Sequence, residues 1–396
     1  MSSLLSYVWL SLKRGLGNYL RAEVLRRMGS PEAVYAADST MLAQSCPSLR
    51  RQHIELLCDK STDEAAQVIT QCAREDIRIL PVSDAAYPDR LRQIEDPPVV
   101  LYIRGRWPDF DTMPGIAVVG TRQATSYGVQ VAGTIGAELA KAGFVTVSGM
   151  ALGNDAAAHR GALRAGGLTV AVLAGGPDVC YPPQNRALMG DILLSGAVIS
   201  EYPPGTEPHG RNYHQRNRII SGLSCGACIV EAPVRSGALI TANLALEQGR
   251  DVFAVPGNID SPNSTGTNAL IRDGAKAITG AQDILSEYEG LYPGRIQYDV
   301  ELYSPPKRAE KVSVSAKTEI DKPQTIPYSD LESRLTEYTE DHRALLRCIS
   351  RGETHVDEMA ASTGFSAAKV LACMTVLTIR GAVKPLPGKR YSLNLK

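Results

Sequence analysis

The sequence predicts an α/β protein built around a mainly parallel sheet, and two features of residues 75–285 support this. Short apolar runs alternate there with stretches of helical length, and most of the runs end in glycine or a small polar residue. Continuous apolar strands separated by helices are typical of a parallel sheet covered on both faces. The eight candidate strands are residues 77–81, 99–104, 116–119, 145–148, 169–173, 197–200, 227–230 and 252–255.

Four helices are expected between these strands, at residues 128–142, 155–165, 185–194 and 238–248. The strand ends carry Gly120-Thr121, Ser148-Gly149, Gly175-Gly176, Ser200-Glu201 and Pro256-Gly257. Glycine lets a backbone approach a phosphate closely, and the start of the following helix favours negative charge. Five such turns along one sheet favour an anion-binding rim, although tight turns alone would also use glycine.

The N-terminal region, residues 1 to about 65, is expected to form short helices. Its apolar segment at residues 4–10 has no basic leader and is followed by Lys13-Arg14, so we interpret it as a first helix and not as a signal peptide. Gly15-Leu16-Gly17 before an amphipathic helix is typical of a helix-hairpin-helix, in which free amides at a helix start meet a phosphate. An ordinary helical turn explains this segment equally well.

The C-terminal third divides into a linker and a small domain. Residues from about 290 to 335 gain proline and lysine and lose periodicity, as linkers do. Helical patterns at 341–350, 356–362 and 367–380, followed by a hairpin around residues 386–390, predict a winged helix. The expected recognition helix carries one cation, Lys369, so protein binding and weak non-specific DNA binding both stay open. The expected domains are therefore residues 1–70, 71–290 and 336–396, with a linker at 291–335.

Composition limits the partners of the chain. Its 396 residues carry 42 basic and 42 acidic side chains, so no global field draws it to nucleic acid or membrane, and a polyanion must meet a local patch. Eight scattered cysteines predict reduced thiols in a cytoplasmic protein. Cys225 and Cys228 form a C-x-x-C without a second pair, which favours buried small side chains over a metal site. No apolar run approaches transmembrane length.

Two arginine-containing segments are the main candidates for a binding site. Arg216-Asn217-Arg218 precedes the strand at 227–230, and we interpret it as a turn, because arginines at i and i+2 cannot share one helix face. Such a turn would aim several planar donors at one anion. Arg122 follows the strand at 116–119 in the same way. Both segments lie beside strand ends, where open parallel sheets bind their ligands.

An ordered series of motifs gives the chain a resemblance to a known family. The motifs are Val119-Gly120-Thr121-Arg122 with Tyr127-Gly128; Ser148-Gly149-Met150-Ala151 through Asp155 to Ala158-His159; Val172-Leu173-Ala174-Gly175-Gly176 with Tyr181-Pro182; Ser200-Glu201; Arg216-Asn217-Arg218; Val230-Glu231-Ala232 with Ser236-Gly237 and Thr241; and Val255-Pro256-Gly257 with Gly266-Thr267-Asn268 and Gly274-Ala275. Over residues 77–279 the chain resembles the DNA-processing protein A family, also called DprA or Smf. Two positions depart from the family pattern: Asn154 stands where an aliphatic residue is usual, and Tyr213-His214 replaces the usual Phe-Pro.

The resemblance implies an extended Rossmann fold that binds single-stranded DNA and loads the RecA recombinase onto it. It also implies a homodimer that protects incoming DNA during natural transformation. The residues themselves predict no catalytic activity, cofactor or metal site. The nucleic-acid-binding residues expected on these grounds are Gly120, Thr121, Arg122, Ser148, Gly149, Arg216, Asn217, Arg218, Ser236, Gly237, Thr241 and Lys276. Arginines would hold the phosphates, hydroxyls would add donors, and glycines would leave amides accessible.

A Rossmann-type nucleotide-binding enzyme, such as a nucleoside phosphate hydrolase, is the alternative. Against it, Gly120-Thr121-Arg122 lacks the G-x-G-x-x-G spacing and no P-loop occurs. A nucleoside phosphate hydrolase of this kind would place a Thr and a Glu one helical turn apart. Thr241 and Glu247 are six residues apart, on different faces of a helix. Asp155 and His159 stand at i and i+4 without an accompanying nucleophile, so we interpret them as structural.

Overall fold

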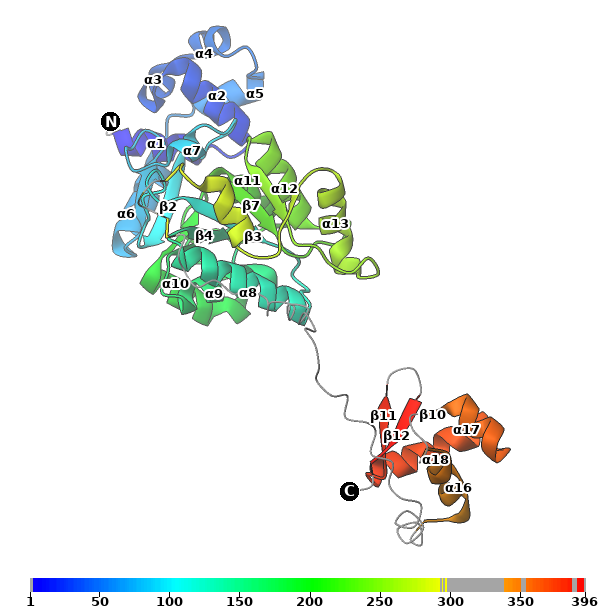
Figure 1. Ribbon diagram of the computed structural model, residues 1–396. Coiled ribbons are helices and arrows are strands. Elements are labelled where there is room, and N and C mark those ends of the chain that lie inside the picture. The colour runs from blue at the N-terminus through cyan, green and yellow to red at the C-terminus, as the bar shows by residue number, and fades with distance from the viewer. Residues whose placement is uncertain are drawn as a thin grey trace. The chain divides into compact units, whose positions relative to one another are not determined.

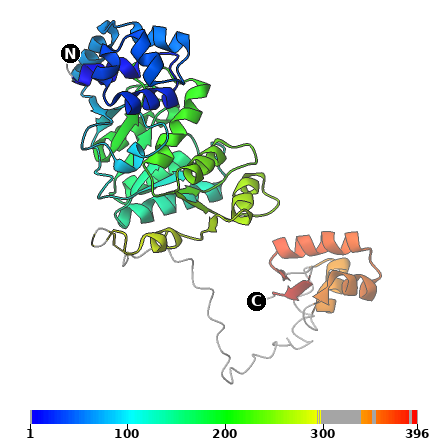
Figure 2. The ribbon, with the colours of Figure 1, turned by 90° about the horizontal axis from the view of Figure 1, so that it is seen from above.

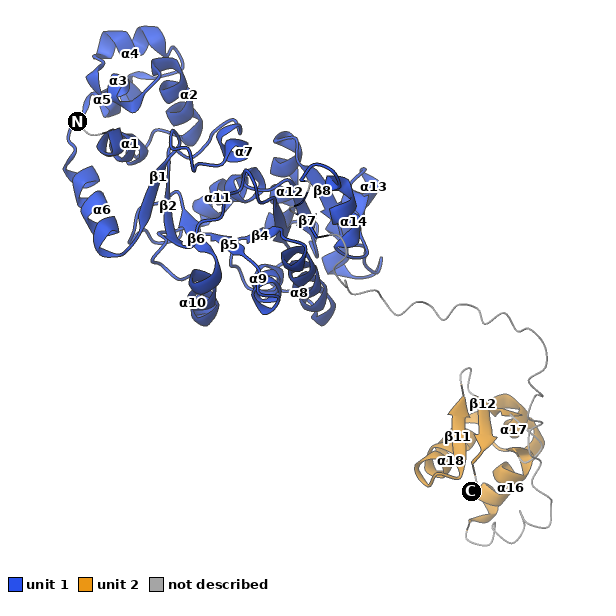
Figure 3. Ribbon diagram, turned by 60° about the vertical axis from the view of Figure 1, so that its left-hand side comes forward, with its two compact units in different colours: residues 1–306 blue, residues 307–396 orange. Residues whose placement is uncertain are grey.

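The computed structural model describes residues 3–292, 294, 296–297, 338–349, 354–386 and 390–394. The chain forms two compact units, residues 1–306 and 307–396 (Figure 3). Most of the expected linker, residues 291–335, lies outside the described residues.

The first unit contains a nine-stranded sheet in the order β1-β2-β6-β5-β4-β3-β7-β8-β9 (Figure 1). Neighbouring strands from β6 to β9 are parallel, whereas β2 runs antiparallel to both β6 and β1. The strands are β1 (Arg78–Pro81), β2 (Val100–Gly105), β3 (Gly115–Val119), β4 (Val145–Ser148), β5 (Thr169–Val172), β6 (Ala197–Ser200), β7 (Gly226–Ile229), β8 (Asp251–Ala254) and β9 (Lys276–Ala277). The predicted α/β class is confirmed, and β9 is the one strand of this sheet that the apolar pattern did not predict.

Helices cover both faces of the sheet. In Figure 3, α8, α9 and α10 lie on one side of it and α11 and α12 on the other. The helices of this region are α7 (Asp89–Arg92), α8 (Ser126–Lys141), α9 (Asn154–Arg164), α10 (Arg186–Ser195), α11 (Gly210–Gly222), α12 (Gly237–Glu247), α13 (Thr265–Arg272) and α14 (Gln282–Leu285), with 3-10 turns at Pro183–Asn185, Pro262–Ser264 and Ser286–Tyr288.

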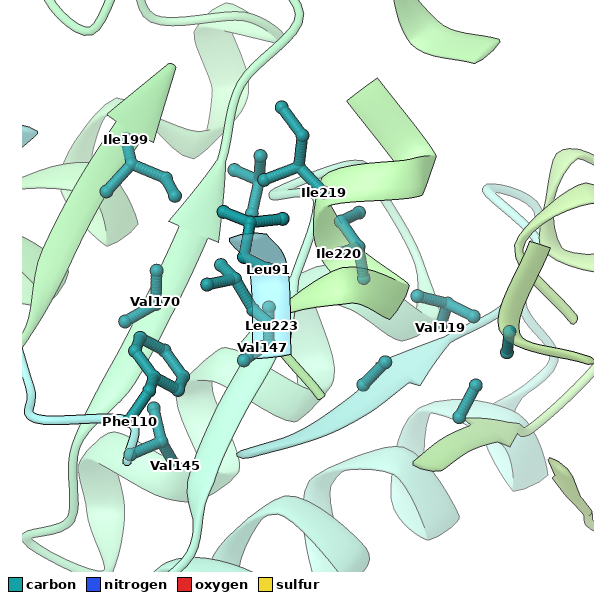
Figure 4. Close-up of a cluster of buried hydrophobic side chains, with 14 of the residues drawn as sticks. Leu91, Phe110, Val119, Val145, Val147, Val170, Ile199, Ile219, Ile220 and Leu223 are labelled. Atoms are coloured by element: carbon teal, nitrogen blue, oxygen red, sulfur yellow. The ribbon is translucent and has the colours of Figure 1, made fainter. Parts of the chain in front are cut away.

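The strand sequences place one apolar side chain after another on alternate faces, because successive residues of a strand point in opposite directions. Ala117 and Val119 of β3 join the core beneath α11 and α12, whereas Ile116 and Val118 join the core beneath α8 and α9. Figure 4 shows the first of these cores, to which Ile219 of α11 contributes. Burial on both faces explains why the strands are continuously apolar.

The chain changes direction across the sheet between β3 and β7. The strands β4, β5 and β6 follow one another on one side of β3, and β7, β8 and β9 follow one another on its other side. The connections after β3 and β7 therefore lead to opposite faces, and they diverge at the carboxyl ends of these strands. Open α/β sheets bind ligands at this topological switch point.

The N-terminal helices lie together at one end of the same unit, drawn in blue in Figure 2, and share a core with β2. Val8 and Trp9 of the first helix share a core with Val100 and Tyr102 of β2. The first helix is where the sequence predicted it. These helices are α1 (Ser3–Ser11), α2 (Asn18–Met28), α3 (Pro31–Ala36), α4 (Ser39–Ser45), α5 (Arg51–Cys58) and α6 (Asp63–Arg74).

The second unit has the helices and hairpin expected of a winged helix. Its elements are α16 (Glu340–Ile349), β10 (Thr354–His355), α17 (Val356–Thr363), α18 (Ala367–Ile379), β11 (Val383–Leu386) and β12 (Arg390–Leu393), with strand order β10-β12-β11. Gly364 takes a left-handed conformation and ends α17. Among the described residues no single helix is long and apolar enough to cross a membrane, and α17 with α18 passes that test only as a pair bent by 111°.

Close packing of α8 on α9 generates a prediction. A Cβ on Gly161 would lie 2.1 Å from the carbonyl oxygen of Gly133, whereas Gly190, in α10, has no neighbour within 4 Å. Gly161→Ala should therefore lower the free energy of unfolding by about 1–3 kcal/mol through overpacking. Gly190→Ala should raise it by about 0.5–1 kcal/mol, since alanine favours the helix. Urea unfolding of both variants measures the difference, and a loss of stability in both would show that helix packing is not its source.

Candidate functional site

A pocket of about 560 Å³ lies at the carboxyl ends of β3 and β7, at the topological switch point. Four parts of the chain line it: the β3–α8 loop, the segment entering α9, one face of α11, and the β7–α12 loop with the start of α12. The lining residues are Val119, Gly120, Thr121, Arg122, Gln123, Ala151, Asp155, Gly210, Tyr213, His214, Arg216, Asn217, Ile220, Pro233, Arg235, Ser236, Gly237, Ala238 and Thr241.

Glu231 ties the two loops of the pocket together. The Thr121 amide donates to the Glu231 carbonyl oxygen at 2.8 Å. The amide and hydroxyl of Thr125 donate to the Glu231 carboxylate at 3.0 and 2.6 Å. Thr125 also caps α8, since its hydroxyl accepts from the Gly128 amide. The β3–α8 loop is therefore held against the end of β7 before any ligand binds.

Gly120 allows Asn154 to pack directly beneath this loop. A Cβ on Gly120 would lie 2.1 Å from Asn154 Nδ2. Asn154 is fully buried, and neither its Nδ2 nor its Oδ1 has a hydrogen-bond partner among the described residues. A buried polar group without a partner costs about 1–3 kcal/mol. This position, where the family pattern is aliphatic, is thus a local source of instability.

Arg216 lies in α11, so the structure corrects the expected turn to a helix. Its side chain is buried, and its Nη1 donates to the carbonyl oxygens of Gly149, at 2.8 Å, and Val172. A Cβ at position 149 would lie 2.4 Å from Arg216 Nη1, so a larger residue there would displace the guanidinium. Burial lowers the pKa of Arg216, an effect that Asp155 opposes. Carbonyl oxygens hold this cation at the pocket. Among the described residues, no carboxylate forms a hydrogen bond with it.

Asp155 and His159 have structural partners. The Asp155 carboxylate accepts from the Gly149 amide at 3.1 Å. Burial raises the pKa of Asp155, whereas Arg216 and backbone amides lower it. His159 Nδ1 lies 2.7 Å from the Thr169 hydroxyl, and burial lowers the pKa of His159 to about 3. The imidazole is therefore neutral at physiological pH.

Arg218 points away from the pocket. Its Nη2 donates to the Glu201 carboxylate at 2.6 Å, and its Nε lies 3.1 Å from Asp96 Oδ2. Burial alone would lower the pKa of Arg218, but Glu201 and Asp96 raise it above its ordinary value. Asn18 of α2 donates to Glu201 as well, at 3.2 Å. Arg218 therefore anchors α11 to the end of β6 and to the N-terminal helices.

The β7–α12 side of the pocket offers hydrogen-bond donors and a cation. The Ser236 hydroxyl accepts from the Ala238 amide and caps α12, whose first residue is Gly237. Helix starts of this kind favour anions. Arg235 precedes this cap, and its exposed side chain has no ion-pair or hydrogen-bond partner within the part of the chain that the structure describes.

Two tyrosines form an aromatic surface at the pocket. The Arg122 guanidinium lies 4.8 Å from the centre of the Tyr213 ring, and the Tyr181 ring lies 6.3 Å from that of Tyr213. Tyr181 is 50% exposed. A cation on one ring and an exposed second ring provide faces on which a nucleobase can stack.

The structure brings eight of the twelve expected site residues into the pocket: Gly120, Thr121, Arg122, Arg216, Asn217, Ser236, Gly237 and Thr241. The other four expected residues do not line it. Ser148 donates to the Val118 carbonyl oxygen, Gly149 lies beneath Arg216, and Arg218 is in its ion pairs. Lys276 donates to the Asp283 carbonyl oxygen, pairs with Glu287 and borders a different cavity.

Sequence reasoning missed three polar residues of the pocket, Gln123, His214 and Arg235. Gln123 follows the Gly120-Thr121-Arg122 motif directly, so its place in the loop was available as a signal. Arg235 stands alone in a loop, and its position beside Arg122 depends on the pairing of β3 with β7.

The fold and the site together define a Rossmann-type protein with a cationic pocket at the switch point of its sheet. The family model described as DNA recombination-mediator protein A matches residues 78–289, and the one described as DprA winged helix domain matches residues 329–389. The chain belongs to the DNA recombination-mediator protein A family, the DprA or Smf proteins.

Individual relatives agree. Protein Smf of Synechocystis is 36% identical over 339 residues, which is 82% of each chain. DNA processing protein DprA of Bacillus subtilis is 42% identical over 232 residues, which is 59% of this chain and 77% of the relative. The crystal structure of DprA from Streptococcus pneumoniae superposes with a TM-score of 0.63 at 35% identity, covering 72% of this chain and 99% of the other.

The ion pairs of Arg218 generate a second prediction. Arg218→Ala leaves the carboxylates of Glu201 and Asp96 without their buried cation, which should cost about 3–5 kcal/mol of stability. Arg51→Ala, which removes an exposed pair with Glu55, should change stability by less than about 1 kcal/mol. Denaturant unfolding measures both, and equal effects would contradict the anchoring role of Arg218.

The unpaired amide of Asn154 generates a third prediction. Asn154→Leu removes two buried polar atoms and keeps the branching of the side chain, so it should raise the free energy of unfolding by about 1–3 kcal/mol. Asn263→Leu is the matched control, because the Asn263 amide donates to the Gln123 carbonyl oxygen at 2.9 Å. A thermal melt that ranks Asn154→Leu below the wild type would show that the amide is satisfied in solution.

Proposed function

We propose that this chain binds single-stranded DNA in the pocket at the switch point. The observation that carries the proposal is a local concentration of cations on a chain of zero net charge. Arg122 and Arg235 present exposed guanidiniums from two different loops, and Arg216 adds a buried one at the pocket. The start of α12 supplies backbone donors beside them. Arginine forks and helix-start amides are the groups that bind phosphates.

Two features favour a single strand over a duplex. Tyr213 and Tyr181 offer stacking faces, which the bases of a duplex cannot reach because they are already stacked. The pocket has a volume of about 560 Å³, which could accommodate part of an extended single strand. Base-specific readout is not needed for such contacts, so binding should depend little on sequence.

We propose further that the site is not catalytic. Asp155 and His159, at i and i+4, resemble a catalytic pair, but both make structural contacts. Asp155 accepts a hydrogen bond from an amide, and His159 is neutral beside Thr169. The alternative, a nucleotide-binding enzyme, would need a positioned base or metal. Nucleotide turnover by the purified protein would establish that alternative.

Membership of the DprA family supports a wider role. We propose that the bound strand is passed to the RecA recombinase, that this protects incoming DNA during natural transformation, and that the protein acts in the cytoplasm as a homodimer. A dimer would present two pockets to one strand, which raises avidity without a new contact. Light scattering measures the mass in solution, and a RecA filament assay measures the transfer.

The fourth prediction tests the pocket. Arg122→Ala and Arg235→Ala should each weaken binding of a single-stranded oligonucleotide by about fivefold to tenfold, uniformly across sequences. Each should also reduce the slope of log affinity against log salt by about 0.7 to 1, the loss of one phosphate contact. Both side chains are exposed, so melting temperatures should stay unchanged.

The control for both variants is Arg51→Ala, which removes an exposed arginine of α5 and is expected to leave affinity and salt slope unchanged. Fluorescence anisotropy across a salt series measures all three proteins. Wild-type affinity in both pocket variants would place the DNA site elsewhere on the chain.

A further inference from the structure

One more side chain of the pocket, an imidazole, can donate a hydrogen bond to a phosphate. His214 lies on α11, next to Tyr213, and lines the pocket with Arg122 and Arg235. Its ring is exposed and has no hydrogen-bond or ion-pair partner among the described residues. We propose that His214 is a further phosphate-binding residue of this pocket, one that contributes when its imidazole is protonated. The inference rests on the proposed binding of single-stranded DNA.

The charged groups near His214 come from four parts of the chain. On its own helix, Arg211 stands three residues before it, Arg218 four residues after it and Arg216 two residues after it, and Tyr213 is adjacent. The β3–α8 loop contributes Arg122, the β7–α12 loop contributes Arg235, and the start of α9 contributes Asp155. Asp155 is the one carboxylate lining the pocket, and it is buried and bonded to an amide.

This arrangement makes protonation depend on the ligand. His214 lines the pocket together with Arg122 and Arg235, so a phosphate bound by these arginines would share the pocket with the imidazole. A phosphate in contact with the ring favours the imidazolium, which adds a charge-assisted hydrogen bond. Histidine is the side chain whose charge changes between about pH 5 and 8. Binding of DNA should therefore take up a proton at His214.

The sign of the pH dependence follows from this uptake. A group that binds its proton more tightly in the complex strengthens binding fully in acid, and its contribution is lost as pH rises. Affinity for single-stranded DNA should thus be higher at about pH 5.5 than at about pH 8. One partly exposed ion pair corresponds to roughly a threefold to fivefold change.

The experiment is an anisotropy titration of an oligothymidylate, whose bases do not titrate between these pH values, against the full chain at both pH values and several salt concentrations. In the wild type, affinity should rise by roughly threefold to fivefold at the lower pH. The slope of log affinity against log salt should also steepen by about 0.7, one phosphate contact on a single strand. A purely structural histidine would not change the salt slope.

Three variants assign the effect. His214→Gln should bind at both pH values as the wild type does at about pH 8, with one unchanged salt slope. His214→Arg, a permanent cation, should bind at about pH 8 as the wild type does at about pH 5.5. His209→Gln is the matched control, because His209 is exposed, precedes α11 and does not line the pocket, so this variant should keep the full pH dependence.

Several results would overturn the inference. His214 would not be a phosphate contact if the affinity of the wild type did not depend on pH. The same holds if the pH dependence of the affinity survived in His214→Gln or disappeared in His209→Gln. These outcomes would leave the pocket as the proposed DNA site. Absence of single-strand binding by the wild type at every pH would overturn the proposed function and this inference with it.

Discussion

The burial of two guanidiniums on α11 is the interaction on which the site depends. Residues i and i+2 of a helix are about 200° apart around its axis, so Arg216 and Arg218 leave opposite sides of α11. Arg218 meets the carboxylates of Glu201 and Asp96, and Arg216 meets the carbonyl oxygens at the ends of β4 and β5. The helix is thereby fixed to the sheet edge on both sides, and this places Tyr213 at the pocket.

The two arginines are compensated unequally, and the difference matters for ligand binding. Arg218 has two acidic partners, which raise its pKa, whereas burial lowers the pKa of Arg216 and Asp155 opposes this only in part. Removing a charge from water costs several kcal/mol unless it is paired. The Arg216 charge therefore gains from an added anion, and a phosphate in the pocket would supply one. A chain with zero net charge can attract a polyanion in this way, through one incompletely neutralised site.

The elements of the sheet were predictable because they depend on local pattern. Strands buried on both faces must be apolar throughout, and the eight expected strands agree with the structure to within about two residues. The helix around Arg216 was not predictable by the same means, since its buried residues include two arginines and an asparagine beside Ile219 and Ile220, which leaves no apolar period over its length. The partners of Arg218 are also distant in sequence, so its anchoring role depends on a tertiary arrangement that spacing does not reveal. The ion pair of Lys276 with Glu287 is likewise a tertiary contact that the sequence pattern did not indicate.

The topology of the sheet and the contacts of Glu231 explain why the pocket exists before any ligand arrives. Reversal of the strand order between β3 and β7 opens a crevice that the following helices cannot fill. Glu231, at the end of β7, holds the Thr121 amide through its carbonyl oxygen and Thr125 through its carboxylate, so hydrogen bonds join the loops on either side of the crevice. Loops held in this way would need little further ordering when a ligand binds, so the affinity for a phosphate ligand would reflect mainly the phosphate contacts themselves. Variation among such pockets should therefore concentrate in the exposed side chains at the rim, the class to which Arg122 and Arg235 belong.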